Sequence, residues 1–340
     1  MKILHELNQL DCGGAERVVA GIIRHDKQNE HSVYTYKDGP MREVLEKAGA
    51  KVLIEGEGKQ DHQCDLLHIH TGGAESHMAN MVKGYLPTIE TIHSPVVSAV
   101  RDSYIVARVG VSNQVTKINR NCRTIYNGID VDRLKHTSYH DMAAVTRGKK
   151  TLGIPEDTFV IGRLGRIGQD KCLEEFLVAC HKFQKDNDCA VLIVGGEAKD
   201  SPGYLAKVKI MAASLPVKNV CFVDEVEDVR DYYSLMDVFL YPSPTEGFGL
   251  VYFEAMACGV PVVTWDNELT RELLLGDALL EDNTINGLVR GLLWVQVYGR
   301  SSIAEIVEHA KQRSISEFSE QRMSENYQGL YQEIFDNQVK

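Results

Sequence analysis

Residues 158–196 read TFVIGRLGRIGQDKCLEEFLVACHKFQKDNDCAVLIVGG, and this stretch contains a strand, a helix and a second strand in succession. The apolar run CAVLIV at 189–194 ends in two glycines and predicts a buried strand. Residues 171–186 are amphipathic and predict the helix between the two strands. A helix that joins two such strands is typical of a parallel sheet.

The same alternation continues on both sides of this stretch. Short apolar runs alternate with amphipathic segments from MKILHEL at 1–7 to VPVVTW at 260–265. The pattern predicts an α/β protein with mostly parallel, doubly wound sheets that helices cover on both faces. Residues 136–153 are polar and lack a strand pattern, and 340 residues exceed the usual size of one core. Two domains are therefore expected.

We predict an N-terminal Rossmann-like domain over residues 1–148 and a second domain over 149–316. Residues 317–340 are expected to form a terminal helix. Its apolar residues fall on one helical face, so the helix should dock on another element; they are Met323, Tyr327, Leu330, Tyr331 and Ile334.

Composition excludes several classes of protein. Apolar residues at 44% and charged residues at 25% are typical of a globular protein. No apolar run reaches the roughly 18 residues that cross a bilayer, and no signal peptide is apparent, so a cytoplasmic protein is expected. The eight cysteines are scattered without metal-ligand spacing, which indicates reduced thiols.

Charge distribution and glycine spacing argue against two further classes of protein. The first 148 residues are formally neutral, and the rest carries the whole net charge of -11. An acidic second half argues against a general nucleic-acid binder. No GxGxxG fingerprint follows a strand, so a Rossmann dehydrogenase is disfavoured.

The strongest functional signal is PSPTEGFGLVYFEAMACGVPVV at 242–263. Glu246 and Glu254 flank a Gly-Phe-Gly loop and the start of a predicted helix. Such a loop offers backbone N–H groups at a helix N-terminus, and each carboxylate can accept hydrogen bonds from paired sugar hydroxyls. The alternative is a surface glutamate and an ordinary helix-start carboxylate.

A pair of cations follows the first strand of the second domain. Arg166 and Lys171 lie near the point where doubly wound sheets bind ligands, so they can hold a diphosphate and neutralise it as it leaves. Two solvated side chains are the alternative, and Arg163 is a rival for the arginine role.

Three signals lie in the first domain. Gly13 and Gly14 precede a helix and expose amides to an anion, unless they form only a tight turn. His93 ends a strand, where it can bind a sugar hydroxyl or an acceptor, although a lone histidine is more often structural. His68 and His70 alternate on one strand and share a face, and no third metal ligand has suitable spacing, so they are interpreted as structural or as pocket lining.

Together these residues resemble glycosyltransferase family 4, a group of retaining GT-B enzymes among the glycosyl transferases group 1. The resemblance covers nearly the whole chain. The matching motifs are GGAE (13–16), HxH (68–70), the later His93, VSN (111–113), NGID (127–130), the Arg166 and Lys171 pair, and EGFGLVYFEAMACGVPVV (246–263).

The resemblance implies two Rossmann-like domains facing a central cleft, with the last helix crossing back to the first domain. By similarity, the first domain is the acceptor side and the second binds the donor. Arg166 and Lys171 would hold the donor diphosphate, and Gly13 and Gly14 would approach it. Further donor contacts are implied for Glu246, Gly247, Phe248, Gly249 and Leu250 (sugar), Glu254 (ribose), and Val223, Asp224 and Glu225 (base). His93 would contact the sugar or acceptor.

The implied function is retaining transfer of a sugar from a UDP- or GDP-sugar to an acceptor hydroxyl, in cell-surface glycan or glycolipid synthesis. The catalytic residues would be Arg166, Lys171, Glu246 and His93, with no metal and no cofactor. A GT-B sugar-nucleotide epimerase and a non-catalytic sugar-nucleotide binder remain as alternatives.

The acceptor, whether glycan, lipid or small molecule, is not encoded in a motif. Residues 101–123 carry five cations against Asp102 alone, which predicts a basic patch that attracts anionic lipid or a phosphorylated acceptor. Peripheral contact with a membrane would follow. The alternative is an ordinary solvated helix face.

Overall fold

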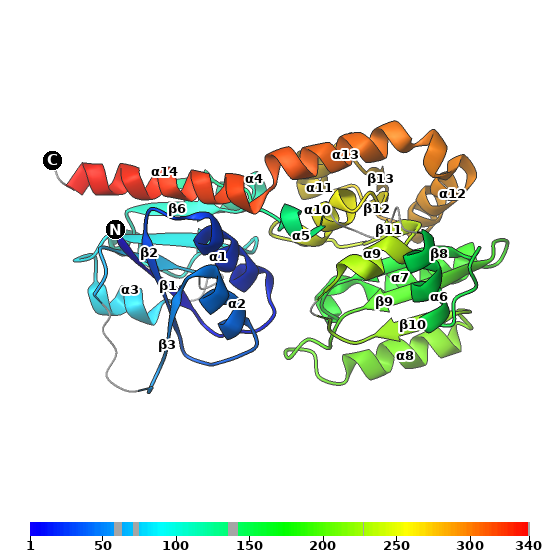
Figure 1. Ribbon diagram of the computed structural model, residues 1–340, viewed down its shortest axis with the longest axis horizontal. Helices are drawn as coiled ribbons and strands as arrows, with labels where there is room; N and C mark the ends of the chain where they lie inside the picture. The colour runs from blue at the N-terminus through cyan, green and yellow to red at the C-terminus, as the bar shows by residue number, and fades with distance from the viewer. Residues whose placement is uncertain (58–62, 71–74, 135–141, 227, 339–340) are drawn as a thin grey trace. The chain divides into compact units, whose positions relative to one another are not determined.

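The computed structural model describes residues 1–57, 63–70, 75–134, 142–226 and 228–338. Contacts group the chain into two compact units (Figure 1). Unit 1 comprises Met1–Asp130, Glu246–Leu250 and Ser316–Lys340, and unit 2 comprises Val131–Thr245 and Val251–Ile315. Contact grouping is a different criterion from the extent of an independently folding domain, so the domain limits 1–148, 149–316 and 317–340 stay predictions.

Unit 1 is built on a parallel sheet whose neighbouring strands all run in one direction. In sheet order the strands are β3 (Lys51–Ile54), β2 (Glu30–Thr35), β1 (Lys2–Leu7), β4 (Leu66–Ile69), β5 (Thr88–Ile92), β6 (Ala107–Gly110) and β7 (Cys122–Thr124). Every residue of β4 and β5 is buried, as expected for central strands that helices cover on both faces.

Helices cover both faces of this sheet. They are α1 (Gly14–His25), α2 (Met41–Ala48), α3 (His77–Val82), α4 (Asn113–Ile118) and α14 (Glu320–Gln338). Ile3 and Leu66 face α1 and α14, whereas Leu4 and Leu67 face α3. The alternation of neighbouring residues between the two cores follows the two-residue period of a strand.

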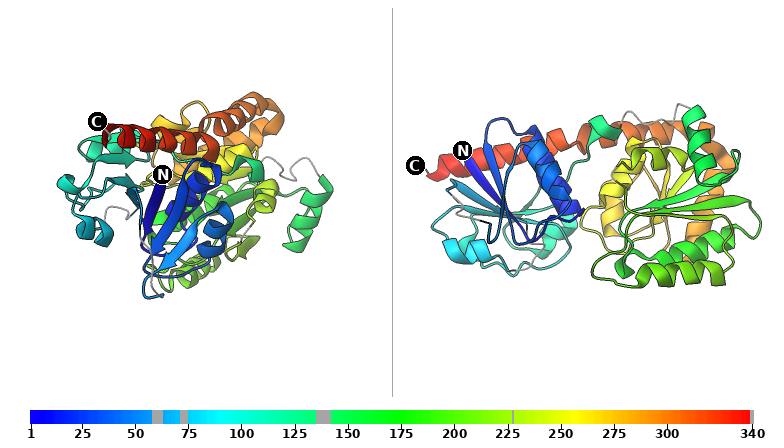
Figure 2. Two further views of the ribbon diagram at one scale, coloured as in Figure 1. Left: turned by 60° about the vertical axis from the view of Figure 1, so that its left-hand side comes forward. Right: turned by 60° about the horizontal axis from the view of Figure 1, so that its bottom comes forward.

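The terminal helix α14 packs along α1, and both are seen side by side in Figures 1 and 2. All five apolar residues of its predicted docking face are buried, and they form one core with α1 and the sheet. The Ser324 hydroxyl donates to the Ile22 carbonyl across this contact at 2.8 Å. The predicted return of the last helix to the first part of the chain is therefore confirmed.

The NGID turn holds the segment that enters α14. Ile129 N–H donates to the Phe318 carbonyl at 2.7 Å, and Glu320 N–H donates to the Ile129 carbonyl at 2.9 Å. A Cβ atom at Gly128 would lie 2.4 Å from the Ser319 carbonyl oxygen, so only glycine allows this close approach.

Unit 2 contains a second parallel sheet. In sheet order its strands are β10 (Val220–Val223), β9 (Cys189–Val194), β8 (Phe159–Leu164), β11 (Val238–Leu240), β12 (Val262–Trp265) and β13 (Leu279–Glu281). Its helical segments are α5 (Val131–Leu134), α6 (Met142–Thr151), η3 (Gln169–Lys171), α7 (Leu173–Phe183), α8 (Tyr204–Ser214), α9 (Arg230–Leu235), α10 (Leu250–Ala257), α11 (Glu268–Leu274), α12 (Ile285–Ser302) and α13 (Ala304–Glu317).

The main core of unit 2 lies between the sheet and the helices α7, α8 and α12. Of the polar segment 136–153, residues 136–141 lie outside the described part of the chain, and 142–151 form α6. The strand, helix and strand predicted over residues 158–196 are β8, α7 and β9.

Both sheets place their first strand between the second and the fourth, which is the doubly wound order. The order reverses between β1 and β4 in unit 1 and between β8 and β11 in unit 2. Ligands of such sheets bind outside the carboxyl ends of the strands at these reversals. The predicted α/β fold with two doubly wound sheets is confirmed.

Candidate active-site residues

Arg166 and Lys171 come together after β8, at the reversal point of the unit 2 sheet. Arg166 Nη1 lies 2.9 Å from Asp200 Oδ2, and Lys171 Nζ lies 3.1 Å from Asp170 Oδ2. Arg166 Nη2 is 3.5 Å from the same Asp170 oxygen, so one carboxylate links both cations. The Arg166 side chain is 47% exposed and the Lys171 side chain 13%, which leaves the arginine open to a ligand.

The rival arginine occupies a different environment. Arg163 is fully buried, its Nη1 donates to the Lys171 carbonyl at 2.7 Å, and its guanidinium stacks on the Tyr241 ring at 4.8 Å. It supports the backbone of the loop that carries Lys171. The structure therefore favours Arg166 for contact with a ligand.

Other predicted donor contacts lie at the same edge of unit 2. Glu254 sits in the second turn of α10, where its Oε2 accepts from the Tyr233 hydroxyl at 2.9 Å. Val223 ends β10, and Asp224 and Glu225 follow it as exposed residues. Glu254 is therefore not a helix-start carboxylate, and its hydrogen bond to Tyr233 fixes its orientation.

In unit 1, the loop Glu246–Leu250 lies against His93. A Cβ atom at Gly247 would lie 1.9 Å from the His93 carbonyl oxygen, so this position has room for glycine only. The Phe248 ring packs on Phe318 with centroids 5.8 Å apart. Leu250 Cδ1 would be 3.8 Å from a Cβ at Gly14. Three separate sequence signals, the GGAE loop, His93 and the EGFG loop, thus meet in unit 1.

The helix N-terminus that follows Gly13 is already occupied by a carboxyl group of the chain itself. The Glu16 carboxylate folds back so that a Cβ at Gly13 would lie 2.2 Å from Glu16 Oε2. Burial raises the pKa of Glu16 to about 7. A phosphate group approaching Gly13 and Gly14 would therefore have to displace Glu16.

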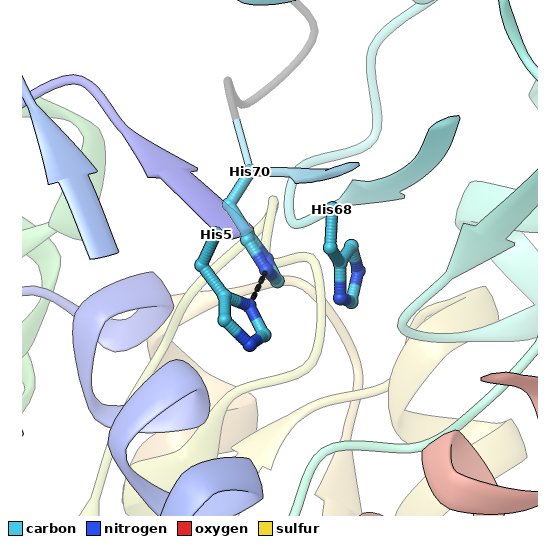
Figure 3. A group of neighbouring side chains, drawn as sticks. All are labelled: His5, His68 and His70. Carbon is cyan, nitrogen blue, oxygen red and sulfur yellow. Dashed lines mark hydrogen bonds between the residues drawn. The ribbon is translucent and has the colours of Figure 1, made fainter. Parts of the chain in front are cut away.

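Sequence reasoning missed most of the surroundings of His93. His93 Nε2 lies 3.0 Å from His70 Nδ1, His70 Nε2 lies 3.2 Å from His5 Nδ1, and His5 Nε2 lies 3.0 Å from His31 Nδ1. Figure 3 shows the contact between the His5 and His70 rings as a dashed line. The signal available in the sequence was histidine on β1 and β2 in addition to the HxH strand.

His68 shares the face of His70, as predicted, but it bonds elsewhere. Its Nε2 lies 2.7 Å from Thr91 Oγ1 and its Nδ1 lies 2.8 Å from the Tyr331 hydroxyl. Burial lowers the pKa of His93 to about 4, and burial and neighbouring rings hold the pKa values of His5, His68 and His70 well below their usual range.

His5, His68 and His70 offer ligand atoms within 4.8 Å of one another, so a metal ion must be considered. Each of their ring nitrogens already has a hydrogen-bond partner at 2.7 to 3.2 Å. The arrangement fits a hydrogen-bonded cluster better than a metal centre.

The basic patch expected at residues 101–123 is partly neutralised. Arg108 is buried between Glu90 and Asp102, with its Nε 2.7 Å from Glu90 Oε2. Arg123 forms a two-bond pair with Glu333 of α14 at 2.8 and 3.0 Å. Carboxylates outside the segment thus pair with two of its five cations, and contact of this segment with a membrane or a phosphorylated acceptor stays a prediction.

Across the described ranges, none of the helices combines the length and apolar character needed to cross a membrane.

Comparison with known proteins relates part of the chain to a known family. Residues 145–296 match the family described as glycosyl transferases group 1. N-acetyl-alpha-D-glucosaminyl L-malate synthase of Bacillus anthracis is 26% identical over 290 residues, 76% of this chain and 70% of that protein. Alpha-monoglucosyldiacylglycerol synthase of Acholeplasma laidlawii is 31% identical over 164 residues, but these span only 39% of its length and 48% of this chain.

A solved structure extends the likeness to the whole chain. The Anabaena protein HepE, in complex with UDP and glucose, superposes with a TM-score of 0.82 at 17% identity, covering 98% of this chain and 99% of HepE. Residues 145–296 thus belong to the glycosyl transferases group 1 family, and the whole chain has the GT-B fold of glycosyltransferases, as the resemblance in the sequence implied.

Proposed function

We propose that this protein is a retaining glycosyltransferase that moves a sugar from a nucleotide-diphosphate sugar, with UDP or GDP as the nucleotide, to an acceptor hydroxyl. The observation that carries the proposal is the pair Arg166 and Lys171 at the reversal point of the unit 2 sheet. The UDP bound to HepE, a protein of the same fold, supports a nucleotide donor.

The two cations supply the chemistry that a diphosphate leaving group requires. Asp170 and Asp200 now hold them, so the donor phosphates would exchange with these carboxylates as partners. Cations placed in advance at a developing negative charge stabilise the transition state without reorganisation. No divalent metal is needed in this scheme.

The remaining residues would orient the sugar. Glu246, Gly247 and the amides of Phe248, Gly249 and Leu250 would hold its hydroxyls at the start of α10, and Glu254 would hold the ribose. His93 would accept a hydrogen bond from the sugar or the acceptor. For retention, the acceptor oxygen attacks on the face that the phosphate leaves, and the departing phosphate oxygen takes the acceptor's proton.

The acceptor is proposed to be a glycan, a lipid or a small molecule in glycan or glycolipid synthesis. The names of the two relatives above describe an L-malate product and a diacylglycerol product, so both acceptor classes belong in a screen. With a lipid acceptor the enzyme would act at the cytoplasmic membrane face. Flotation with anionic vesicles tests whether the protein binds such a membrane.

The test combines a donor screen with three variants. Binding of UDP-, GDP- and ADP-sugars is measured by calorimetry, and transfer is then followed with the preferred donor, the anomeric proton of the product reporting retention. Arg166→Ala and Lys171→Ala should each lower transfer by about 100-fold or more, by analogy with the loss of one oxyanion donor. Arg290→Ala is the matched control, because Arg290 is also an exposed arginine held by two carboxylates, Glu281 and Asp282.

Several outcomes would overturn parts of the proposal. Loss of transfer on chelation with recovery on adding magnesium would contradict metal independence. A change in the donor sugar without any acceptor would indicate an epimerase. Donor binding without consumption, under every acceptor tried, would indicate a non-catalytic sugar-nucleotide binder.

A further inference from the structure

A line of four imidazoles in unit 1 connects His93 to a buried carboxylate. From His93 the contacts run through His70 and His5 to His31 at 3.0, 3.2 and 3.0 Å, and His31 Nε2 then lies 3.2 Å from Asp26 Oδ2. Asp26 follows α1, and its relative exposure is 4%. The line therefore runs from the end of α1 across β2, β1 and β4 to the end of β5.

Neutral imidazole carries one N–H donor and one bare nitrogen acceptor. In a line of neutral rings, each donor must meet an acceptor, so the N–H groups all point in the same direction. The lowered pKa values of His5, His70 and His93 support neutral rings. Whatever fixes the direction at one end therefore fixes the tautomer of every ring.

Asp26 fixes the direction at its end. Burial opposes its ionisation, but contacts with His31, Asn29 and Gln28 outweigh burial and lower its pKa to about 2. The His31 Nε2 atom does not meet the geometry of a hydrogen bond to Asp26, so the interaction is the attraction of an N–H dipole to a nearby anionic oxygen. A bare nitrogen at 3.2 Å from that oxygen would be repelled.

With Nε2 of His31 protonated, the other tautomers follow in order. His31 Nδ1 accepts from His5 Nε2–H, His5 Nδ1 accepts from His70 Nε2–H, and His70 Nδ1 accepts from His93 Nε2–H. His93 Nδ1 is left as a bare acceptor. Within the described part of the structure this atom is buried and lacks a hydrogen-bond partner.

We propose that Asp26, acting through His31, His5 and His70, holds His93 in the Nε2–H tautomer, so that Nδ1 is kept as an acceptor for a substrate hydroxyl. The role of His93 Nδ1 as an acceptor for a substrate hydroxyl rests on the proposed function, whereas the predicted tautomers do not. The four residues from Asp26 to His70 are positioning residues. A buried acceptor without a partner is costly, and a hydroxyl donor from the substrate would remove that cost.

His68 provides an internal control. It lies beside His70 in the same buried cluster, with the two ring centroids 4.0 Å apart (Figure 3). Its hydrogen bonds, however, go to Thr91 and Tyr331 and not to the line. Its replacement disturbs packing in the cluster but leaves every link from Asp26 to His93 in place. Substitution of His68 should therefore leave the tautomer of His93 unchanged.

The test reads the tautomers directly in the donor-free, full-length protein labelled with ¹⁵N-histidine. Long-range ¹H–¹⁵N correlation spectra show which ring nitrogen carries the proton, and single substitutions assign each ring. His31, His5, His70 and His93 are all expected to be protonated on Nε2 alone. Protonation of any of them on Nδ1 overturns the proposal. The tautomers are read in the unsubstituted protein, and the variants serve only to assign its signals.

Asp26→Asn tests the control by the carboxylate. An amide N–H₂ facing His31 would make its Nε2 an acceptor and favour the reverse direction, so His93 should shift to the Nδ1–H form in most molecules. His68→Gln should leave His93 unchanged. An identical His93 signal in Asp26→Asn, in a spectrum that is otherwise native, would refute the proposal, and none of these results depends on glycosyl transfer.

Discussion

Glu16 changes its charge near neutral pH. Burial raises its pKa to about 7 in the folded protein from an ordinary value of 4.5. Between these two values the folded state binds more protons than the unfolded state, so the stabilising contribution is present at low pH and is lost as the pH rises through 7. Above pH 7 the folded protein carries a desolvated carboxylate over Gly13.

Glu16→Gln should therefore raise the free energy of unfolding at pH 8.5 by about 1–3 kcal/mol and change it little at pH 5. The helix N-terminus stabilises the negative charge of Glu16, so removal of this charge should make the increase smaller. Urea unfolding at both pH values measures the difference. Glu43→Gln is the matched control, because Glu43 also lies in the first turn of a helix but is exposed and pairs with Lys47. Equal gains for Glu16→Gln at both pH values would contradict the interpretation.

Gly128 decides how the element α14 is attached. A methyl group there would lie 2.4 Å from the Ser319 carbonyl oxygen, so the segment that enters α14 must move. Gly128→Ala should lower the free energy of unfolding by about 1–3 kcal/mol, as overpacking usually does, and should reduce amide protection in α14. Urea titration and hydrogen exchange measure the two effects.

Gly329 supplies the comparison within α14 itself. This glycine is exposed, and nothing lies within 4 Å of a Cβ added to it. Gly329→Ala should stabilise the protein by up to about 1 kcal/mol through helix propensity. If both substitutions changed the free energy of unfolding in the same direction, the close approach of Gly128 to Ser319 would not be what excludes a side chain there.

Elements were predictable because burial on both faces leaves a local pattern in the sequence. The runs that became β8, β9 and α7 could be recognised from their own residues. The partner of Gly128 could not, since Ser319 is far away along the chain and only the packing of α14 brings it near. The same reason hid the line of histidines: His5 faces His68 only through the register of β1 with β4.

At the scale of the molecule, charge counted along the sequence was a poor guide to surface charge. Arg108 and Arg123 appeared to belong to a basic segment, but Glu90 and Glu333 neutralise them in the fold. Arg166 and Lys171, in contrast, were predicted from their position after a strand, and the structure places them at the reversal point of the sheet. Position relative to an element was the more reliable signal because the fold class fixes where strands end.

Acid should affect the two units differently. Of the described histidines, the four whose pKa values are lowered, His5, His68, His70 and His93, all belong to unit 1. Their ordinary value is 6.5, so on acidification the unfolded state takes up protons first. Their stabilising contribution is present above about pH 6.5 and is lost as the pH falls, for His93 until about pH 4.

Between its unfolded and folded pKa values, each of these histidines should lower the free energy of unfolding by about 1.4 kcal/mol for each pH unit of acidification. Glu16 has the opposite dependence and should cancel the contribution of one histidine. Hydrogen exchange at pH 7 and pH 5, corrected for the intrinsic rate, should therefore show β1 and β4 losing protection while β8 and β9 keep theirs. His68→Gln should make the pH dependence of unit 1 shallower by one histidine, whatever its effect on stability at pH 7. Equal loss in both sheets, or loss in β8 first, would show that these imidazoles are not buried in the neutral form.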